Sequence, residues 1–332
     1  MKKRVLLVSL FLLFVSARIL LAQTLNSADA MDTTRSGVIN WTIGEVYATG
    51  IGAPPSHPAN MAQARAMAER AAYVVAIRNL LETVKGVRVD SESVVENFMT
   101  KSDVIRTKVD GVVKGARVVK TQYLSDGSVE VLVAMSMKGA FLNAVVPDTF
   151  GRAGGGLLPT KPAVPAPAPS KPSTPPLMPD QKPEPAKPSP QPEKKTEPQR
   201  PDSPQPAPVT SSPSTVVFKG GVATGLAIDG TGLGLRPALL PRIIDQQGNE
   251  LYVGQVVTRT NAVEQGVAGY AKDVTAAANN FRVTDNPAVI KGIGATGTAR
   301  TDIVIGQADA QTLREMGNKG DFLKYCRVII VY

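Results

Sequence analysis

The chain has 332 residues, a net charge of +9 and a single histidine, and 43% of its residues are hydrophobic. This length predicts about two domains, each large enough to bury its own core. The basic residues are scattered and aromatic residues make up only 5% of the chain. The sequence therefore excludes the basic, aromatic-interleaved surface of a nucleic-acid-binding protein and indicates a milder attraction to anionic polymers or lipids.

The amino terminus has the pattern of a secretory signal peptide. Positively charged MKKR precedes the apolar run VLLVSLFLLFV, and small-residue cleavage sites occur at Ala22 and at residues 28–30. We predict a signal peptide at residues 1–22, with cleavage as late as residue 30, and export of the remainder. An uncleaved membrane anchor is the alternative, because apolar residues continue beyond Arg18. No cysteine stands directly after the apolar run, so we expect no lipid anchor on an amino-terminal cysteine.

The only cysteine is Cys326, near the carboxyl terminus. An exported protein with one cysteine has no internal disulfide, so its cores depend on packing alone. The apolar surroundings of Cys326 in KYCRVIIVY favour a buried small hydrophobe over a reactive thiol.

Residues 151–214 differ sharply in composition from the rest of the chain. The run KPAVPAPAPSKPSTPPLMPDQKPEPAKPSPQPEKKTEPQRPDSPQPAP has no aromatic residue and few large apolar ones, so it has too little apolar surface to fold. Its prolines favour polyproline II, which extends about 3.1 Å per residue. We predict a disordered, proline-rich linker that holds two folded domains apart as a stalk.

The first domain is expected at residues 38–148. It opens with the strand pattern WTIGEVYATGIG, which Ala-Pro-Pro ends. Helix formers dominate residues 60–84, and Gly86 follows where a left-handed helix C-cap is expected. At 100° per residue the apolar face of this helix comprises Met67, Val74, Ile77, Leu81 and Val84. We expect that face to pack on a sheet.

A hairpin completes the first domain, after a weaker helical stretch at residues 93–109. Its arms are GARVVKTQYL and VEVLVAMSM, joined by Ser-Asp-Gly-Ser. The second arm alternates buried-type and polar positions, as a half-buried strand does. The predicted fold class is α+β: a small antiparallel sheet covered by a long helix.

The second domain is expected at residues 215–332, and its pattern is also α+β. The expected strands are TGLAIDG, TDIVIG and CRVIIVY, with a hairpin about Gln247-Gly248 in PRIIDQQGNELYVG. The expected helices are EQGVAGYAKDVTAAANN and QADAQTLREMG. The last strand is continuously apolar and should lie in the middle of a sheet. The role of this domain is not indicated by its sequence.

Few residues are suited to catalysis. His57 lies in the turn Pro-Pro-Ser-His-Pro, so neither a histidine-based triad nor a multi-histidine metal site can form. Gly230, Gly232 and Gly234 lack the helix that a phosphate-binding loop requires, because Pro237 follows them. A carboxylate-based hydrolase would need two converging acids, and the sequence indicates no such pair. We expect no enzyme activity, no cofactor and no metal.

Two sets of residues are candidates for binding. Arg236, Arg242 and Arg259 in the second domain are candidate contacts to an anionic ligand. Val118 and Tyr123 on the hairpin are candidates for self-association, because a small open sheet leaves the backbone groups of its edge strand unpaired.

Short motifs between residues 45 and 140 form a distinctive combination. They are the Gly50-Ile51-Gly52 turn, the alanine-rich AxARAxAxRAA helix, and the KGxxV and VKGA segments. This combination resembles the twenty-kilodalton outer-membrane lipoprotein (LPP-twenty) family, and the flagellar protein FlgP and the amino-terminal domain of FlgT look similar. The resemblance implies a helix-over-sheet domain in envelope or basal-body assemblies, without catalytic residues. The carboxyl-terminal half resembles uncharacterised exported bacterial proteins.

Together these patterns predict a non-catalytic exported protein that is periplasmic or associated with the outer membrane. It would act as a structural or assembly component of the envelope, including the flagellar basal body, through self-association or contacts with other envelope proteins. The alternative is a periplasmic binding module for peptidoglycan, polysaccharide or lipid. A cell-wall pull-down distinguishes the two, since only a binding module is retained.

Overall fold

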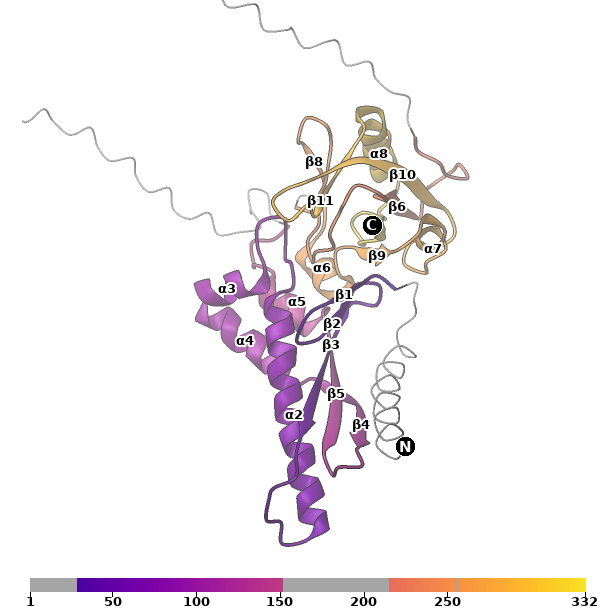
Figure 1. The fold of residues 1–332 in the computed structure, drawn as a ribbon. Helices are drawn as coiled ribbons and strands as arrows, with labels where there is room; N and C mark the ends of the chain where they lie inside the picture. The colour runs from indigo at the N-terminus through magenta and orange to yellow at the C-terminus, as the bar shows by residue number, and fades with distance from the viewer. Residues whose placement is uncertain (1–28, 152–214, 255) are drawn as a thin grey trace, which may run out of the picture. The chain divides into compact units, whose positions relative to one another are not determined.

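The computed structural model describes residues 29–151, 215–254 and 256–332, which belong to one compact unit with two sheets (Figure 1). The predicted signal peptide and the predicted proline-rich linker lie outside the described residues. Within the described ranges, no helix is both long enough and apolar enough to span a membrane. The fold class is α+β in both halves, as predicted.

The first sheet is antiparallel and has the strand order β1-β2-β3-β5-β4. Its strands are β1 (Met31–Thr33), β2 (Val38–Asn40), β3 (Glu45–Gly52), β4 (Arg117–Tyr123) and β5 (Val129–Ser136). The predicted hairpin is confirmed as β4 and β5, and Gly127 in its turn has a φ of +85°, a conformation that favours glycine. Strands β1 and β2 extend the sheet beyond the predicted strands.

Helix α2 (Met61–Lys85) covers one face of this sheet, as predicted (Figure 1). The predicted apolar face is correct for Val84, which is buried, and for Ile77 and Leu81, which pack against the core, but it is wrong for Met67 and Val74, which are 49% and 59% exposed. The buried positions of α2 are Ala64, Ala68, Ala72, Ala76, Leu80, Thr83 and Val84. An alanine stripe with a spacing of four residues therefore faces the sheet.

Two glycines of β3 explain why alanine is selected on α2. A Cβ atom added to Gly50 would lie 2.2 Å from the carbonyl oxygen of Ala72, and one added to Gly52 would lie 2.1 Å from that of Ala68. The backbones of helix and strand are thus in direct contact, and a larger side chain would separate them. Met67 and Val74 are exposed for this reason, whereas Leu80 and Val84 are buried near the end of the helix.

The end of α2 differs from the predicted left-handed cap. Gly86 has φ −79° and ψ −4°, which is right-handed, and its N–H donates to the carbonyl oxygen of Thr83 at 3.2 Å. The last turn of α2 tightens to a bond between residues three apart, and Gly86 does not adopt the left-handed conformation. The predicted left-handed cap is therefore wrong. The weaker helical stretch is two helices, α3 (Val95–Lys101) and α4 (Asp103–Lys114), and the Ser102 hydroxyl caps the second. Helix α5 (Ala140–Val145) follows the hairpin.

The second sheet is mixed and has the strand order β8-β7-β11-β10-β6-β12-β9. Its strands are β6 (Gly225–Asp229), β7 (Ile243–Ile244), β8 (Glu250–Tyr252), β9 (Gly269–Ala271), β10 (Pro287–Thr296), β11 (Asp302–Ile305) and β12 (Val328–Val331). Strand β12 is buried and lies between β6 and β9, parallel to both, so the predicted interior position of the last strand is confirmed. The hairpin about Gly248 is confirmed as β7 and β8. Strand β10 was not predicted.

Helices α6 (Arg259–Gln265), α7 (Val274–Ala278) and α8 (Gln307–Lys319) accompany the second sheet. Helix α8 and strand β11 agree with the prediction. The single helix expected at residues 264–280 is wrong, because that segment contains the end of α6, then β9, then α7. Gly266, with a φ of +74°, ends α6 by turning the chain out of the helix.

The two halves share one hydrophobic core, which corrects the expectation that a stalk holds them apart. The backbone N–H groups of Leu239 and Leu240 donate to the carbonyl oxygens of Arg88 and Val89 at 2.9 and 2.8 Å. The Arg88 side chain donates to the carbonyl oxygen of Pro237 at 2.6 Å. These contacts join the end of α2 directly to the second half.

Candidate functional site

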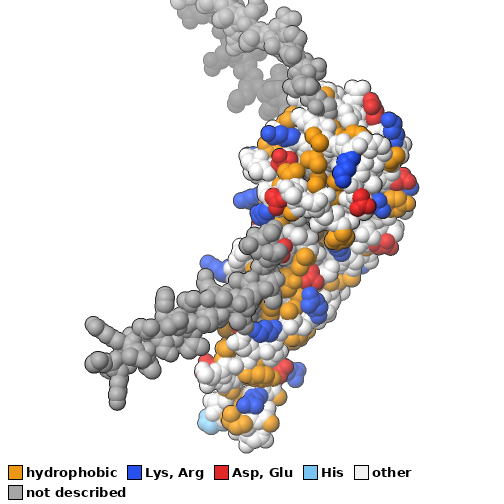
Figure 2. All heavy atoms as spheres, turned by 90° about the vertical axis from the view of Figure 1, so that its right-hand side faces the viewer, with side chains coloured by type: hydrophobic (Ala, Val, Ile, Leu, Met, Phe, Trp, Pro, Cys, Tyr) orange, Lys and Arg blue, Asp and Glu red, His pale blue; other side chains and the backbone are white. Residues whose placement is uncertain are grey.

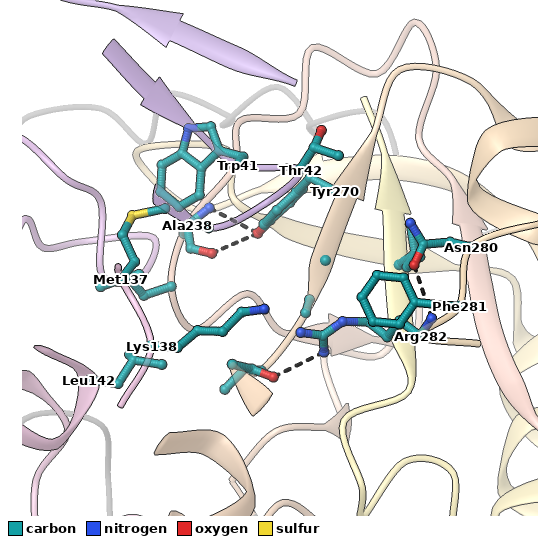
Figure 3. Close-up of a pocket in the computed structure, with 17 residues that line it drawn as sticks. Trp41, Thr42, Met137, Lys138, Leu142, Ala238, Tyr270, Asn280, Phe281 and Arg282 are labelled. Carbon is teal, nitrogen blue, oxygen red and sulfur yellow. Dashed lines mark hydrogen bonds between the residues drawn. The ribbon is translucent and has the colours of Figure 1, made fainter. Parts of the chain in front are cut away.

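A pocket opens where residues of the two halves meet (Figure 3). This junction pocket has a volume of about 50 Å³ and is lined, among others, by Trp41, Lys138, Ala238, Tyr270, Phe281 and Arg282. A second hollow of about 430 Å³, the outer hollow, shares Lys138, Phe281 and Arg282 with it. The two cavities are therefore neighbours, and the outer hollow is the larger of the two.

Arg282 is held in the junction pocket by backbone carbonyl groups. Its Nη1 donates to the carbonyl oxygens of Gly266 at 3.1 Å and Cys326 at 2.5 Å, and its Nη2 donates to that of Gln265. Gln265 and Gly266 are at the end of α6, where unpaired carbonyl groups attract a cation. No carboxylate among the described residues pairs with Arg282, so its charge is not neutralised by an acid.

Lys138 is the second cation of the junction pocket, and its side chain points toward Arg282 (Figure 3). The Nζ atom is half-buried and has neither a hydrogen-bond nor an ion-pair partner in the part of the chain that the structure describes. Burial lowers the pKa of Lys138, and the charge of Arg282 lowers it further. Two like charges facing each other in a partly desolvated pocket attract an anion.

The wall of the junction pocket is fixed by aromatic residues. The Tyr270 hydroxyl donates to the carbonyl oxygen of Ala238 at 2.8 Å and accepts from the Ala238 N–H at 2.9 Å (Figure 3). The Trp41 ring packs edge-on against Tyr270 with the ring centroids 5.7 Å apart. Burial raises the pKa of Tyr270. The phenol is therefore a neutral structural group that keeps the pocket in shape.

The outer hollow combines exposed aromatic and basic side chains. Phe281 is 88% exposed and Tyr325 is 49% exposed, and both line the hollow. Arg327 adds a third cation beside Lys138 and Arg282, while Glu264 is the acid in the lining. The hollow is therefore positive overall, with an apolar rim.

Two of the three predicted anion contacts, Arg242 and Arg259, form ion pairs within the molecule. Arg242 forms an ion pair with Asp302 at 2.5 Å and donates to the Ser91 hydroxyl at 3.2 Å. Arg236 is exposed. None of the three predicted arginines lines the junction pocket or the outer hollow. Their role as ligand contacts remains a prediction that the structure does not favour.

Arg259, the third of these arginines, also joins the two halves. It donates to the Asn143 side chain at 2.8 Å and forms an ion pair with Asp148 at 3.2 Å. Both partners belong to the first half of the chain. Arg259 therefore stabilises the junction at α5 and α6.

The predicted self-association residues lie on the edge strand β4. Val118 and Tyr123 are 51% and 57% exposed, and the Tyr123 hydroxyl donates to Glu69 of α2 at 3.1 Å. The register of β4 shifts between Val118 and Lys120, which marks a bulge. Self-association through these residues remains a prediction.

The described residues contain no group of three or more His, Cys, Asp or Glu side chains that could hold a metal ion. His57 is exposed in a turn. Cys326 is fully buried, as predicted, and burial raises the pKa of its thiol to about 11. On the face in Figure 2, basic and acidic side chains are interspersed.

Comparison with known proteins finds a match in each half. Residues 45–136 match the family model of the LPP20 lipoprotein, and residues 225–332 match that of the second domain of Treponema pallidum Tp0624. The resemblance of the first half to the LPP-twenty family is therefore confirmed. No curated protein matches the chain. The first match contains β3, α2, β4 and β5, and the second contains Tyr270 and Arg282, whereas the junction-pocket residues of the first half, among them Trp41 and Lys138, lie just outside the first match.

Proposed function

We propose that this chain is a non-catalytic exported protein of the cell envelope, a structural or assembly component that binds an anionic envelope molecule in the junction pocket. The LPP20 match supports an exported, envelope-associated protein. The observation that carries the binding role is the pair Lys138 and Arg282, which face each other without an acid between them.

An anion in the junction pocket would reduce the repulsion between the two cations that line it. Lys138 and Arg282 repel each other, and burial deprives both of part of their hydration. A carboxylate or phosphate oxygen placed between them gains charge-assisted hydrogen bonds, each contributing about 1.5–3 kcal/mol. The volume of about 50 Å³ admits one such acid group, and the outer hollow has room for the rest of the molecule.

Calorimetric titration of the protein with two soluble anions tests this role. The probes are N-acetylmuramic acid, which has a carboxylate, and sn-glycerol 3-phosphate. N-acetylglucosamine, which has no carboxylate, is the uncharged control. We expect one or both anions to bind, and the variant Lys138→Gln to weaken binding about tenfold, the loss that one charge-assisted hydrogen bond predicts.

Lys120→Gln is the matched control variant. It removes the same charge from β4, at an exposed position outside both cavities, and should leave the affinity unchanged. Absence of binding by both anions at millimolar concentration would overturn the binding role. Equal losses in the two variants would show a general charge effect and would also count against the pocket.

Self-association is a second candidate function, supported by the exposed side chains of Val118 and Tyr123 on edge strand β4. Arg117, Lys120 and the bulge between them are features that discourage pairing of edge strands. Contact through the side chains of β4 is therefore favoured over extension of the sheet. Association with flagellar basal-body proteins would be one form of this function.

Light scattering behind size exclusion tests the second candidate on the full chain. The candidate requires a discrete oligomer that dissociates when Val118 and Tyr123 are both replaced by glutamate. A monomeric parent protein, or an oligomer whose mass the double variant leaves unchanged, would remove this candidate.

A further inference from the structure

The rim of the outer hollow carries the most exposed large apolar side chain of the described residues. Phe281 is 88% exposed and follows α7, whereas Tyr325 is 49% exposed and precedes β12. Because both residues line the outer hollow, two loops that are distant in sequence bring their rings to one rim. Two exposed aromatic rings in the lining of one hollow, unlike a single exposed apolar residue, are a candidate contact surface.

Basic side chains surround these two rings. Lys138, Arg282 and Arg327 line the same hollow, and Glu264 is the acid among the lining residues. Lys324 adds a further cation, with its Nζ atom 5.9 Å from the centre of the Tyr325 ring. The outer hollow therefore combines two exposed aromatic rings with a net positive lining.

This combination fits a membrane surface better than a soluble ligand. Phe281 is 88% exposed, so most of its ring is free to contact a surface larger than the hollow itself. Aromatic side chains lie favourably at the boundary between lipid headgroups and acyl chains, and cations beside them meet the phosphate groups of anionic lipids. A membrane surface can contact the aromatic rings and the basic side chains at the same time.

We propose that the outer hollow docks on an anionic membrane surface. The lipid phosphate lies at Lys138 and Arg282, the two cations that the outer hollow shares with the junction pocket, with Arg327 as a further cation of the hollow, and the Phe281 ring inserts at the level of the upper acyl chains. This inference rests on the proposed binding function and names the anion as a phospholipid headgroup. Membrane contact at this rim requires no helix that crosses the bilayer.

Co-sedimentation with vesicles tests the inference on the protein without the predicted signal peptide of residues 1–22, because that apolar run would itself bind lipid. The vesicles are phosphatidylcholine alone or phosphatidylcholine mixed with phosphatidylglycerol. We expect at least about tenfold tighter binding to the mixed vesicles, since each basic residue near an anionic surface strengthens association severalfold. Phe281→Ser and Arg327→Gln should each weaken that binding about five- to tenfold.

Met61→Ser is the matched control for loss of an exposed apolar side chain. Met61 is 69% exposed at the start of α2 and lines neither cavity, so its replacement should leave vesicle binding unchanged. Equal binding to the two vesicle types, or full binding by Phe281→Ser, would overturn the membrane inference. Binding of soluble sn-glycerol 3-phosphate without binding to mixed vesicles would overturn it as well, while leaving the proposed function intact.

Discussion

The positive charge of Lys138 lowers the stability of the folded protein. Its ammonium group is half-buried beside Arg282, and its pKa is lowered by burial and by that neighbouring charge. A lysine whose pKa is lower in the folded than in the unfolded state destabilises the fold at every pH below the folded pKa. A group with such a shifted pKa in a pocket is a candidate functional residue, and the proposed anion binding would make use of its charge.

Replacing Lys138 by methionine should therefore stabilise the protein while weakening anion binding. Methionine keeps the apolar stem and removes the charge, so we expect the Tm at neutral pH to rise by about 2–4 °C, the shift that about 1 kcal/mol produces in a protein of this size. Differential scanning calorimetry checks the result, with Lys120→Met as the control that should not raise the Tm. A lower Tm for Lys138→Met would show that the lysine stabilises the fold.

The lowered pKa of Lys138 also predicts how anion binding depends on pH. The affinity for N-acetylmuramic acid should fall as the pH rises through the pKa of Lys138 in the free protein, which lies below the ordinary value of 10.5. Arg282 stays charged over the same range. Titrations from about pH 7 to about pH 10 measure this fall, and Lys138→Arg should remove it because arginine remains protonated. A decline of equal size in Lys138→Arg would assign the titration to another group.

The residues of the junction pocket could not be identified from the sequence because no local pattern connects them. Lys138 follows a strand in the first half, and Arg282 follows α7 in the second. Only the tertiary contact between the halves brings their side chains together. The arginines that sequence reasoning selected are basic residues near turns, and two of them form internal ion pairs instead.

At the scale of elements, the contact of α2 with β3 shows that a helical wheel takes no account of the surface on which the helix packs. The wheel located the helix but ranked Met67 and Val74 as buried because it scores side-chain size and ignores the partner surface. The glycines of β3 leave space for the helix backbone itself, so the small residues of α2 face inward. The hairpin was predictable because its period of two and its turn are both local signals.

Gly50→Ala tests this contact. The new Cβ atom would lie 2.2 Å from backbone atoms of Ala72 and Ala76, and neither backbone can move without separating α2 from the sheet. We expect the free energy of unfolding to fall by about 3 kcal/mol or more, measured by urea denaturation.

Gly111→Ala is the control for the same substitution in open space. Gly111 lies in α4, where a Cβ atom meets nothing within 4 Å, so alanine should stabilise the protein by about 0.5–1 kcal/mol. A loss below about 1 kcal/mol for Gly50→Ala would show that α2 can move away from β3 at little cost.

At the scale of the whole molecule, the two family segments form one folding unit. The sequence predicted two independent domains because a proline-rich segment separates them, and composition contains no information on what the flanking segments contact. The tertiary contacts of Arg88 are an example of what composition does not reveal. Its side chain forms an ion pair with Asp32 and stacks over the Trp41 ring at 5.7 Å, in addition to its bond to Pro237.

Residues 152–214 connect the two halves in sequence, and the contacts between the halves predict the effect of cutting this connection. A protease site introduced within this segment should be cleavable without separating the two fragments, since buried contacts between the halves do not depend on the connection. The nicked protein should elute from size exclusion with the mass of the intact chain and melt in one transition. Separate elution of the two fragments under native conditions would show that the halves are independent.

The contact of Arg88 with Pro237 spans 149 residues of sequence. Strand β12, which completes the interior of the second sheet, lies at residues 328–331. A ribosome delivers these parts in order, so α2 and its sheet can form early, whereas the shared core closes only when the last strand has emerged. For most of its synthesis, the first half therefore exposes the surface around Trp41 and Arg88, and this is when a chaperone would have to protect it.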